Sequence, residues 1–352
     1  MNLSDLPLHA GQWLHGEGPH SDVVISSRIR LARNLAGFPF TTRAKPTQCH
    51  EILDICRRNV LGGKLADSMM WVDLSESELI DSEFLVERHL ISRHLAESDL
   101  PRGVAISESE DIAIMVNEED HLRMQVILGG MQLSEAYDQA NVIDDTLEAG
   151  MPYAFSRMIG YLTACPTNVG TGVRVSVMLH LPALAMTGEI EKVRRAAQDM
   201  HLAVRGFYGE GTEAAGEFYQ VSNQTTLGRS EEEILYDFQD VIIPQVIEYE
   251  RNARTALADF RTAVIDDRIY RSWGLLTSAR LLGSNEALTN LSFLRLGVSM
   301  GRFTETNTRT VNELLLLTQP AHMQKIAGHE LEESELREFR ATFVRERLLA
   351  SN

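Results

Sequence analysis

The sequence predicts a mixed domain of strands and helices followed by an all-helical domain. Its 352 residues are enough for about two domains with separate cores. Strand-like and helix-like runs alternate from about Ser21 to Leu227, whereas beyond this point almost every segment has the apolar spacing of a helix. We therefore expect an irregular, loosely tethered segment over residues 1–20, a catalytic-type domain over 21–228 and a helical domain over 229–352.

The composition is that of a globular protein and argues against two classes, membrane-spanning proteins and nonspecific nucleic-acid binders. The chain is 44% hydrophobic and 24% charged, and no apolar run approaches the roughly 20 residues of a membrane span. The net charge of −17 argues against nonspecific nucleic-acid binding, because phosphates would be repelled, although it does not exclude a local basic pocket. It favours basic partners such as arginine-bearing substrates.

Cysteine usage and the N-terminus predict a reducing, cytoplasmic setting. Cys49, Cys56 and Cys165 form no Cys-x-x-Cys pair, so neither a structural zinc site nor a disulfide framework is expected. The first residues lack a basic stretch followed by an apolar one, so we expect no secretory signal. Cys49 and Cys56 lie on a predicted helix and are expected to belong to its packing.

The first strand is expected around Ser26-Ser27-Arg28-Ile29-Arg30. Because side chains alternate along a strand, one face is apolar and Arg28 and Arg30 project from the other, about 6–7 Å apart. The apolar face contains Val23, Ile25, Ile29 and Leu31. The spacing of the two guanidiniums suits adjacent phosphates of a nucleotide.

An acidic segment, Asn117-Glu118-Glu119-Asp120-His121-Leu122-Arg123, follows an apolar run typical of a buried strand, residues 112–116. Clustered carboxylates in a chain that is already acidic are tolerable if they receive a cation. If the strand continues, Glu119, His121 and Arg123 share a face and Glu118 points elsewhere. A solvated loop with a local Glu–Arg pair remains an alternative.

A turn with a lone cysteine, Cys165-Pro166-Thr167-Asn168-Val169-Gly170-Thr171-Gly172, precedes the next predicted strand. On that strand Arg174 and Ser176 share a face opposite the valines. A lone cysteine is usually a small buried hydrophobe, but beside arginines Cys165 could be held as a thiolate.

A further strand near Leu202 carries Arg205 and runs into a glycine-flanked loop that holds a second acid, Glu210. Arginines thus recur on or beside apolar strands, at Arg28, Arg30, Arg123, Arg174 and Arg205. A surface salt bridge explains any one of them, but a shared polyanion would satisfy all five, because guanidiniums grip phosphate oxygens. The chain has neither a Walker lysine motif nor a kinase-type glycine-rich loop, so arginines would hold the phosphates.

The second domain is expected to begin with a capped helix. Ser230 and Glu233 match a capping box, and an amphipathic stretch continues to Ile247. Pro244 should kink this helix, because proline removes a backbone donor and clashes with the preceding turn.

Together, the Ser-Ser-Arg-Ile-Arg, Asn-Glu-Glu-Asp-His-Leu-Arg, Cys-Pro-Thr-Asn-Val-Gly-Thr-Gly-Val-Arg and Arg-Gly-Phe-Tyr-Gly-Glu-Gly-Thr-Glu segments resemble the phosphagen (guanidino) kinase family in order and spacing. The resemblance covers the whole first domain. It implies an α+β fold, in which helices flank a largely antiparallel sheet and an all-helical C-terminal domain follows. It also implies ATP and Mg²⁺.

The resemblance also implies roles for individual residues. Glu119, Cys165 and Glu210 would surround the substrate guanidinium, and Glu118 would lie near the metal, acting through water. The nucleotide would be bound by a larger set: Ser26, Ser27, Arg28, Ile29, Arg30, His89, Arg123, Arg174, Val175, Ser176, Val177, Met178, Arg205, Gly206, Phe207, Tyr208 and Gly209.

Within this family the chain resembles the bacterial members that phosphorylate arginine in proteins. Small-molecule guanidino kinases carry an extra helical domain before the first arginine strand, and its absence would leave the site open to a protein arginine. The second domain is also similar to theirs, notably at residues 317–321 and 345–348. It departs where Leu336-Arg337 stands in place of an Arg-Asp pair that binds phosphoarginine in the family.

The implied function is transfer of the γ-phosphate of ATP to arginine side chains of proteins, which would mark them for Clp-type proteolysis or regulate a stress repressor. The implied partners are proteins with exposed arginines, a Clp-type ATPase, an activator protein and a second copy in a homodimer, with no membrane and no nucleic acid.

A guanidinium has a pKa above about 12, so its attack on phosphorus requires orientation and loss of a proton. Glu119 and Glu210 could hold it and accept that proton. Two alternatives remain: a kinase for free arginine or another small guanidino compound, and a non-catalytic adaptor that binds arginine-rich or phosphoarginine proteins.

Overall fold

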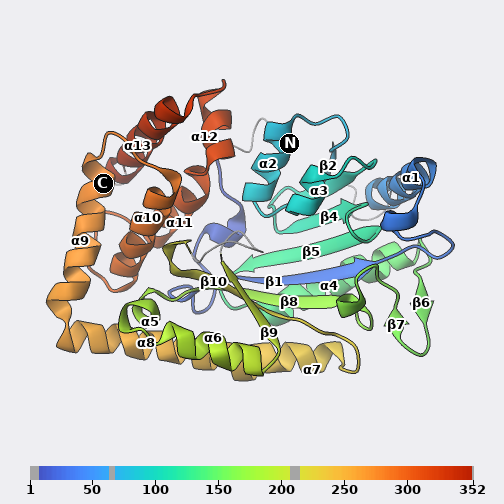
Figure 1. The fold of residues 1–352 in the computed structure, drawn as a ribbon, viewed down its shortest axis with the longest axis horizontal. Helices are drawn as coiled ribbons and strands as arrows, with labels where there is room; N and C mark the ends of the chain where they lie inside the picture. The colour runs from blue at the N-terminus through green and yellow to red at the C-terminus, as the bar shows by residue number, and fades with distance from the viewer. Residues whose placement is uncertain (1–7, 63–67, 207–214, 351–352) are drawn as a thin grey trace.

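The computed structural model describes residues 8–62, 68–206 and 215–350. Within these residues eight strands form one sheet in the order β2-β3-β4-β5-β1-β8-β10-β9, and all neighbouring strands are antiparallel (Figure 1). The prediction of an antiparallel sheet is confirmed. The strands are β1 (Val24–Arg33), β2 (Met69–Asp73), β3 (Gly103–Ser107), β4 (Ile112–Val116), β5 (Leu122–Gly129), β8 (Val173–His180), β9 (Leu202–Gly206) and β10 (Phe218–Asn223), and a separate hairpin pairs β6 (Phe155–Ser156) with β7 (Gly160–Tyr161).

Helices flank the sheet, and among the described residues after β10 the regular structure is helical, as predicted. In Figure 1 the last five helices gather beside one end of the sheet, and α8 runs along its lower side. The helices are α1 (Pro46–Gly62), α2 (Leu79–Glu87), α3 (Arg93–Glu97), α4 (Leu133–Glu148), α5 (Pro182–Thr187), α6 (Ile190–Asp199), α7 (Glu231–Tyr236), α8 (Ile243–Phe260), α9 (Thr262–Ser278), α10 (Ser284–Ser299), α11 (Thr308–Leu317), α12 (Pro320–Ala327) and α13 (Glu333–Leu349). Of the helices described, none has the length and apolar character needed to cross a membrane.

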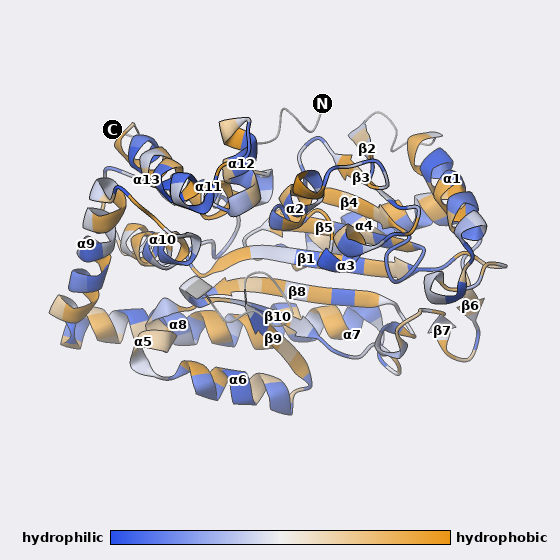
Figure 2. Cartoon of the chain, turned by 45° about the horizontal axis from the view of Figure 1, so that its top comes forward, coloured by the Kyte–Doolittle hydropathy of each residue, from blue (hydrophilic) through white to orange (hydrophobic). Residues whose placement is uncertain are grey.

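The two faces of the sheet differ as alternation requires. Ile29 and Val175 are completely buried in the main core, on the face that α4 covers. Arg28 and Arg30 project from the opposite face, where the antiparallel register places Arg30 directly across from Arg174. Figure 2 shows the central strands mostly in the hydrophobic colour, with a hydrophilic band on β8. The apolar side chains of the strands therefore pack toward α4, and the arginines project from the opposite face of the sheet.

The start of the second predicted domain shows the expected capping box, whereas the kink expected at Pro244 stays a prediction. Ser230 caps α7 and exchanges hydrogen bonds with Glu233, which confirms the capping box. The long amphipathic stretch is interrupted before Pro244 by a π-helical turn, Asp237–Ile242, and α8 then begins with Pro244 in its first turn. Because proline cannot donate to the preceding turn, the backbone widens there.

Two expectations about packing had different outcomes. Cys49 and Cys56 are completely buried on α1, as expected, and burial raises the pKa of the Cys56 thiol to about 12. The expectation of a loosely tethered N-terminus is wrong for its described part, because Trp13 and Leu14 in a short 3₁₀ turn are buried in the main core. Large apolar side chains anchor this irregular segment.

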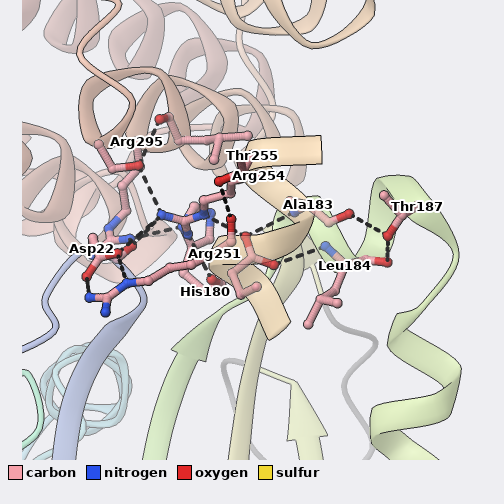
Figure 3. Close-up of polar contacts among 12 residues, drawn as sticks. Asp22, His180, Ala183, Leu184, Thr187, Arg251, Arg254, Thr255 and Arg295 are labelled. Carbon is pink, nitrogen blue, oxygen red and sulfur yellow. Dashed lines mark hydrogen bonds and ion pairs between the residues drawn. The ribbon is translucent and has the colours of Figure 1, made fainter. Parts of the chain in front are cut away.

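A buried ionic network joins the sheet to the helical region (Figure 3). The Glu250 carboxylate on α8 accepts the N–H groups of Ala183 (3.1 Å) and Leu184 (3.0 Å) in the first turn of α5, and Arg254 Nε lies 2.8 Å from it. The carbonyl of His180, at the end of β8, accepts a bond from Arg254. Three elements are thereby held at one point, with the buried carboxylate satisfied by several donors.

Arg295 on α10 completes this network. It donates to the carbonyl of Asp22 (3.0 Å) and lies 3.0 Å from Nδ1 of His180, whose Nε2 is 2.8 Å from Ser292 Oγ. Because arginine can only donate, Nδ1 of His180 is the acceptor and Nε2 carries the proton. Burial, together with the Arg254 charge, lowers the pKa of Arg295 to about 9. The end of β8 and the helical region are therefore coupled through fully buried polar groups.

A second junction lies between α2 and α12. The Glu87 carboxylate accepts the backbone N–H groups of Ala321 (2.9 Å) and His322 (3.0 Å), and Nδ1 of His322 lies 2.7 Å from it. His322 Nε2 faces the guanidinium of Arg88 at 3.1 Å, so the histidine must donate from Nδ1 to Glu87. Arg88 is itself paired with buried Glu110. Glu87 thus caps the first turn of α12 from another helix.

This junction predicts a pH-dependent stability. Burial raises the pKa of Glu87 to about 7, although the N–H groups it accepts favour the ionised form. Because the folded-state pKa lies above the unfolded one, this group's contribution is complete at low pH and is lost as pH rises through about 7. We expect Glu87→Gln to flatten the dependence of the melting temperature on pH between about 5 and 7, compared with the exposed control Glu338→Gln. Parallel melting profiles of the wild type and Glu87→Gln would exclude this effect.

Candidate functional site

A cavity of about 780 Å³ opens on the polar face of the sheet and brings together residues that are distant in the sequence. All five strand-associated arginines line it, from β1, β5, β8 and β9. The complete lining is Arg28, Arg30, Thr42, Val86, His89, Ile91, Ser92, Arg93, His94, Glu118, Glu119, Arg123, Cys165, Thr167, Asn168, Arg174, Arg205, Gln220 and Gln224. The space is large enough for a small-molecule ligand.

The arginines destabilise one another in the absence of an anion. Arg30 and Arg174 face each other across an antiparallel pair, an arrangement that is unfavourable for like charges. Burial, followed by the charges of Arg174 and Arg123, lowers the pKa of Arg28 to about 10. Burial and the neighbouring arginines lower the pKa of Arg30 further below its usual value. A polyanion bound here would relieve both effects.

Two arginine N–H donors on this face also remain without a hydrogen-bond acceptor among the described residues. Nε of Arg28 and Nε of Arg30 are buried and have no hydrogen-bond partner among the described residues. Buried donors are normally satisfied, so these two atoms indicate where a ligand oxygen would bind. His89 lines the same cavity, and burial together with the charges of Arg28 and Arg30 lowers its pKa to about 3. Its imidazole is therefore neutral at physiological pH.

The acidic segment does not continue the strand, so the prediction that it alternates is wrong. β4 ends at Val116, Asn117 adopts a left-handed conformation with φ of 58°, and β5 begins only at Leu122. Asn117 N–H bonds the carbonyl of His121, which closes the turn. His121 does not share a face with Arg123, because its buried ring accepts the N–H of Leu35 and contacts a backbone carbonyl.

The turn places every acid of the segment around Arg123. Its guanidinium pairs with Glu118 (2.8 Å), with Glu119 and with Asp120 (3.3 Å). The prediction that Glu118 points elsewhere is therefore wrong: it is buried, bonds Ser92 Oγ and lines the cavity. Burial opposes the charge on Arg123, but the surrounding carboxylates outweigh it and raise its pKa. The alternative of a local Glu–Arg pair is present, although it lies inside the cavity wall rather than in a solvated loop.

Asp120, which had no role in the sequence prediction, connects this acid group to the cysteine loop. It is completely buried, and its Oδ1 accepts bonds from Asn34 Nδ2 (2.8 Å) and from the N–H of Ala164 (2.7 Å). Ala164 immediately precedes Cys165, whose half-buried thiol lies 3.0 Å from Thr167 Oγ1 on the cavity wall. One carboxylate therefore holds both Arg123 and the backbone next to the thiol.

The loop after the cysteine depends on glycine where it meets β1. Gly172 has φ of 68°, and a Cβ atom there would lie 2.7 Å from the carbonyl oxygen of Ala32. A short 3₁₀ turn, Pro166–Asn168, confirms the turn expected from the sequence.

Removing Asp120 should destabilise the protein. In Asp120→Ala the amide of Asn34 and the N–H of Ala164 lose their common acceptor, at a cost of about 1–3 kcal/mol for each buried donor. Asp120→Asn keeps an acceptor oxygen and should lose less. Urea unfolding of the two variants measures the difference, and equal midpoints for Asp120→Ala and the wild type would contradict this role.

Several residues predicted for nucleotide binding lie away from the large cavity. Ser27 is buried and bonds the backbone of Gly130 and Gln132. The side chains of Ile29, Val175 and Val177 are in the core on the α4 face, because strand alternation turns them away from the arginines. These four assignments are therefore not supported by side-chain position.

The remaining predictions divide between a smaller cavity and an undescribed loop. Ser26, Ser176 and Met178 line a small cavity that adjoins the large one and shares Arg28, His89 and Gln220 with it. Gly206 ends β9. The predicted positions Phe207, Tyr208, Gly209 and Glu210 lie outside the described residues.

The sequence reasoning missed several cavity residues. Trp13, from the N-terminal segment, lines the small cavity and packs edge-on against His89. Gln220 lies opposite Arg205 in the register and could have been found by alternation along β10. Thr42, Ser92, Arg93 and His94 come from loops or helix ends, and no local pattern distinguishes them.

The described residues do not form a metal cage of their own. No group of three metal-ligating side chains is present in the described parts of the chain. Glu118, the predicted indirect ligand, already bonds Ser92 Oγ at 2.6 Å and Arg123 at 2.8 Å. Its role near a metal stays a prediction, and phosphate oxygens and water would have to supply the other ligands.

Comparison with known families identifies both parts of the chain. Residues 56–253 match the model described as "ATP:guanido phosphotransferase, C-terminal catalytic domain". Residues 262–352 match the model described as "Protein-arginine kinase McsB C-terminal domain". The first match runs from α1 into α8 and includes every strand of the sheet except β1, and the second covers the terminal helices.

Similar protein-arginine kinases give the same assignment, and two solved structures of other kinases share the fold. A protein-arginine kinase of Symbiobacterium thermophilum is 46% identical over 96% of this chain and 97% of its own length, and that of Geobacillus stearothermophilus is 45% identical over 96% and 93%. A duplicated taurocyamine kinase of Schistosoma mansoni, solved with transition-state analogue components, shares the fold with a TM-score of 0.60 and 26% identity, over 72% of this chain and 35% of that one. A solved lombricine kinase, 24% identical, shares the fold with a TM-score of 0.58 over 69% of this chain and 71% of that one.

Proposed function

Because this chain belongs to the protein-arginine kinase family, and its activity is thus ATP-dependent phosphorylation of arginine in proteins, we propose that the arginine-lined cavity holds both reactants. The triphosphate of ATP would bind along the arginine face. The guanidinium of a protein arginine would bind at the end formed by Glu119 and Cys165. The observation that carries this proposal is the convergence of all five strand-associated arginines on one cavity that also contains acids and a thiol.

The phosphate end is proposed to consist of Arg28, Arg30, Arg174 and Arg205. Their guanidiniums offer paired donors that match phosphate oxygens, and a bound triphosphate would offset the repulsion between opposed strands. Fixed positive charge of this kind also stabilises an in-line transfer, in which charge spreads over the oxygens of the moving phosphoryl group.

Arg123 is proposed to change partners during the reaction. It is held by Glu118 and by Glu119, and Glu119 is also the carboxylate that would receive the substrate guanidinium. Phosphates bound nearby would attract Arg123, and Glu119 would then be released to pair with the incoming arginine. Glu118 and Asp120 keep Arg123 close to the cavity throughout, because both are buried.

The chemical step requires a neutralised nitrogen nucleophile. Glu119 accepts a proton from the substrate guanidinium while a terminal nitrogen attacks the γ-phosphorus. The new N–P bond forms as the bond from the γ-phosphorus to the bridging oxygen breaks, and ADP leaves with that electron pair. Glu210, outside the described residues, is proposed as the second carboxylate that orients the guanidinium.

Mg²⁺ is proposed to arrive with the nucleotide, where it would neutralise phosphate charge and orient the transferring group. Small hard cations keep water ligands, so an indirect contact with Glu118 fits this chemistry.

We also propose a cellular setting that the family resemblance suggests. Phosphorylated proteins would be delivered to a Clp-type ATPase, an activator protein would assist, and the kinase would act as a homodimer in the cytoplasm. The free thiols of Cys49 and Cys56 fit a reducing compartment. Co-purification of the kinase with a Clp-type ATPase, and its mass in solution, would test the two assemblies.

The activity is tested by incubating the purified protein with ATP and a protein rich in exposed arginine, followed by mass spectrometry under non-acidic conditions. We expect acid-labile phosphoarginine together with stoichiometric ADP. Free arginine should be a poor acceptor, and efficient turnover of it would instead favour a small-molecule kinase. Absence of any ADP formation, with an activator protein supplied, would favour a binding adaptor.

A further inference from the structure

Gln125 on β5 is a buried amide within the arginine face. It is 1% exposed, and the register places it directly across from Arg30 on β1 and from Ala113 on β4. It therefore projects from the same face as Arg28, Arg30 and Arg123. It is not among the residues that line either cavity described above. A buried amide in this place must be hydrogen-bonded, and its partners indicate what it does.

Both ends of the amide contact residues of the proposed nucleotide site. Gln125 Oε1 accepts a bond from Arg28 at 2.5 Å, and Gln125 Nε2 donates to the backbone carbonyl of His89 at 2.6 Å. The orientation of the amide follows from its partners, because arginine can only donate and a carbonyl can only accept. His89 has φ of 60°, which is unusual for a residue other than glycine and needs support from its surroundings.

The contrast with Arg123 shows why a neutral partner matters. Carboxylates surround Arg123 and compensate its charge. Arg28 is instead held by an uncharged oxygen, and its buried Nε has no partner among the described residues. An amide can orient a guanidinium and leave its charge available to an anion, whereas a carboxylate would compete with that anion.

We propose that Gln125 is a positioning residue. It holds Arg28 and the His89 backbone in the arrangement that binds the nucleotide phosphates, and it contacts neither ATP nor the substrate arginine. The inference rests on the proposed function of the cavity. It assigns ATP affinity, rather than the chemical step, to a glutamine on β5, the strand next to β1 in the sheet.

The test uses two replacements of Gln125 in the full-length protein. Gln125→Met keeps the length of the side chain but removes both hydrogen bonds, and we expect ATP to bind about 10-fold more weakly with kcat at saturating ATP little changed. Gln125→Glu places a negative charge next to Arg28 that competes with the phosphates for it, and its affinity for ATP should fall further than that of Gln125→Met. The affinities of both variants are measured by calorimetric titration with ATP. Titration with inorganic tripolyphosphate isolates the phosphate contacts.

Two further variants separate positioning from folding. Gln324 also bridges two groups, the N–H and carbonyl of Leu331, but it lies on α12 outside the cavity, so Gln324→Met should alter the melting temperature and not the ATP affinity. If Gln125 acts mainly through Arg28, then Arg28→Met combined with Gln125→Met should weaken ATP binding by clearly less than the product of the two single effects.

The outcomes are distinguishable. Wild-type affinity in Gln125→Met, or fully additive losses in the double variant, would overturn the positioning role while leaving the proposed function intact. Failure of the wild-type protein to bind either ATP or tripolyphosphate would instead overturn the proposed function itself.

Discussion

Replacing Glu119 with alanine is expected to lower kcat for phosphorylation of protein arginine by about 10²–10⁴-fold, with little change in ATP affinity. Glu119 is the most exposed of the acids around Arg123, with 36% of its side chain accessible, so an incoming guanidinium can reach it. Arg123 would still be held by buried Glu118 and Asp120, so the phosphate end of the cavity should persist. Loss of the base therefore affects the chemical step selectively.

Glu119→Gln provides the matched isostere, because it keeps the size of the side chain and cannot accept the proton. It should be nearly as impaired as Glu119→Ala. Glu338→Ala, which changes an exposed acid in the helical region, should retain wild-type turnover. Turnover is measured as acid-labile phosphoarginine in parallel with ADP, and undiminished phosphoarginine in Glu119→Ala would remove the residue from the mechanism.

Replacing Arg30 with methionine is expected to weaken ATP binding by about 10–100-fold, since hydrogen bonds to charged groups each contribute roughly 1.5–3 kcal/mol. The same change should raise the free energy of unfolding of the nucleotide-free protein by about 1 kcal/mol, because it removes a partly buried charge that lies across from Arg174. Function and stability should therefore change in opposite directions.

Calorimetric titration with ATP and urea unfolding without nucleotide measure the two effects in the same preparation. Arg271→Met on α9 is the matched control, because this side chain is 79% exposed, and it should alter neither quantity appreciably. A decrease in the stability of Arg30→Met would mean that Arg30 is a structural ion-pair partner and would contradict the proposed phosphate contact.

Much of the fold could be predicted from local patterns. Alternation along β1 and β8 separated the arginines from the valines, and the register then placed Arg30 across from Arg174. The Ser230 capping box was equally visible, since it depends on interactions within one turn. Strand alternation and helix capping are short-range effects, so a single sequence reveals them.

The error at the acidic segment had a specific local cause. The prediction extended the alternation of strand side chains through residues 117–121. The left-handed conformation of Asn117 instead turns the chain, so the acidic side chains converge on Arg123. Asparagine tolerates this conformation better than most residues, yet its presence alone does not require it. The turn forms because His121 and Asn117 are held by partners distant in sequence, such as Leu35 and Cys49.

By itself, the sequence determined the family, the alternating arginines and the change from mixed strands and helices to an all-helical region, because each follows from motifs or from spacing between near neighbours. Only the tertiary structure decided which acids compensate Arg123, that buried Asp120 joins it to the cysteine loop, and that Gln125 holds Arg28 without neutralising it. These contacts join residues up to 97 positions apart. They depend on the strand register and the packing of loops, which no local pattern specifies.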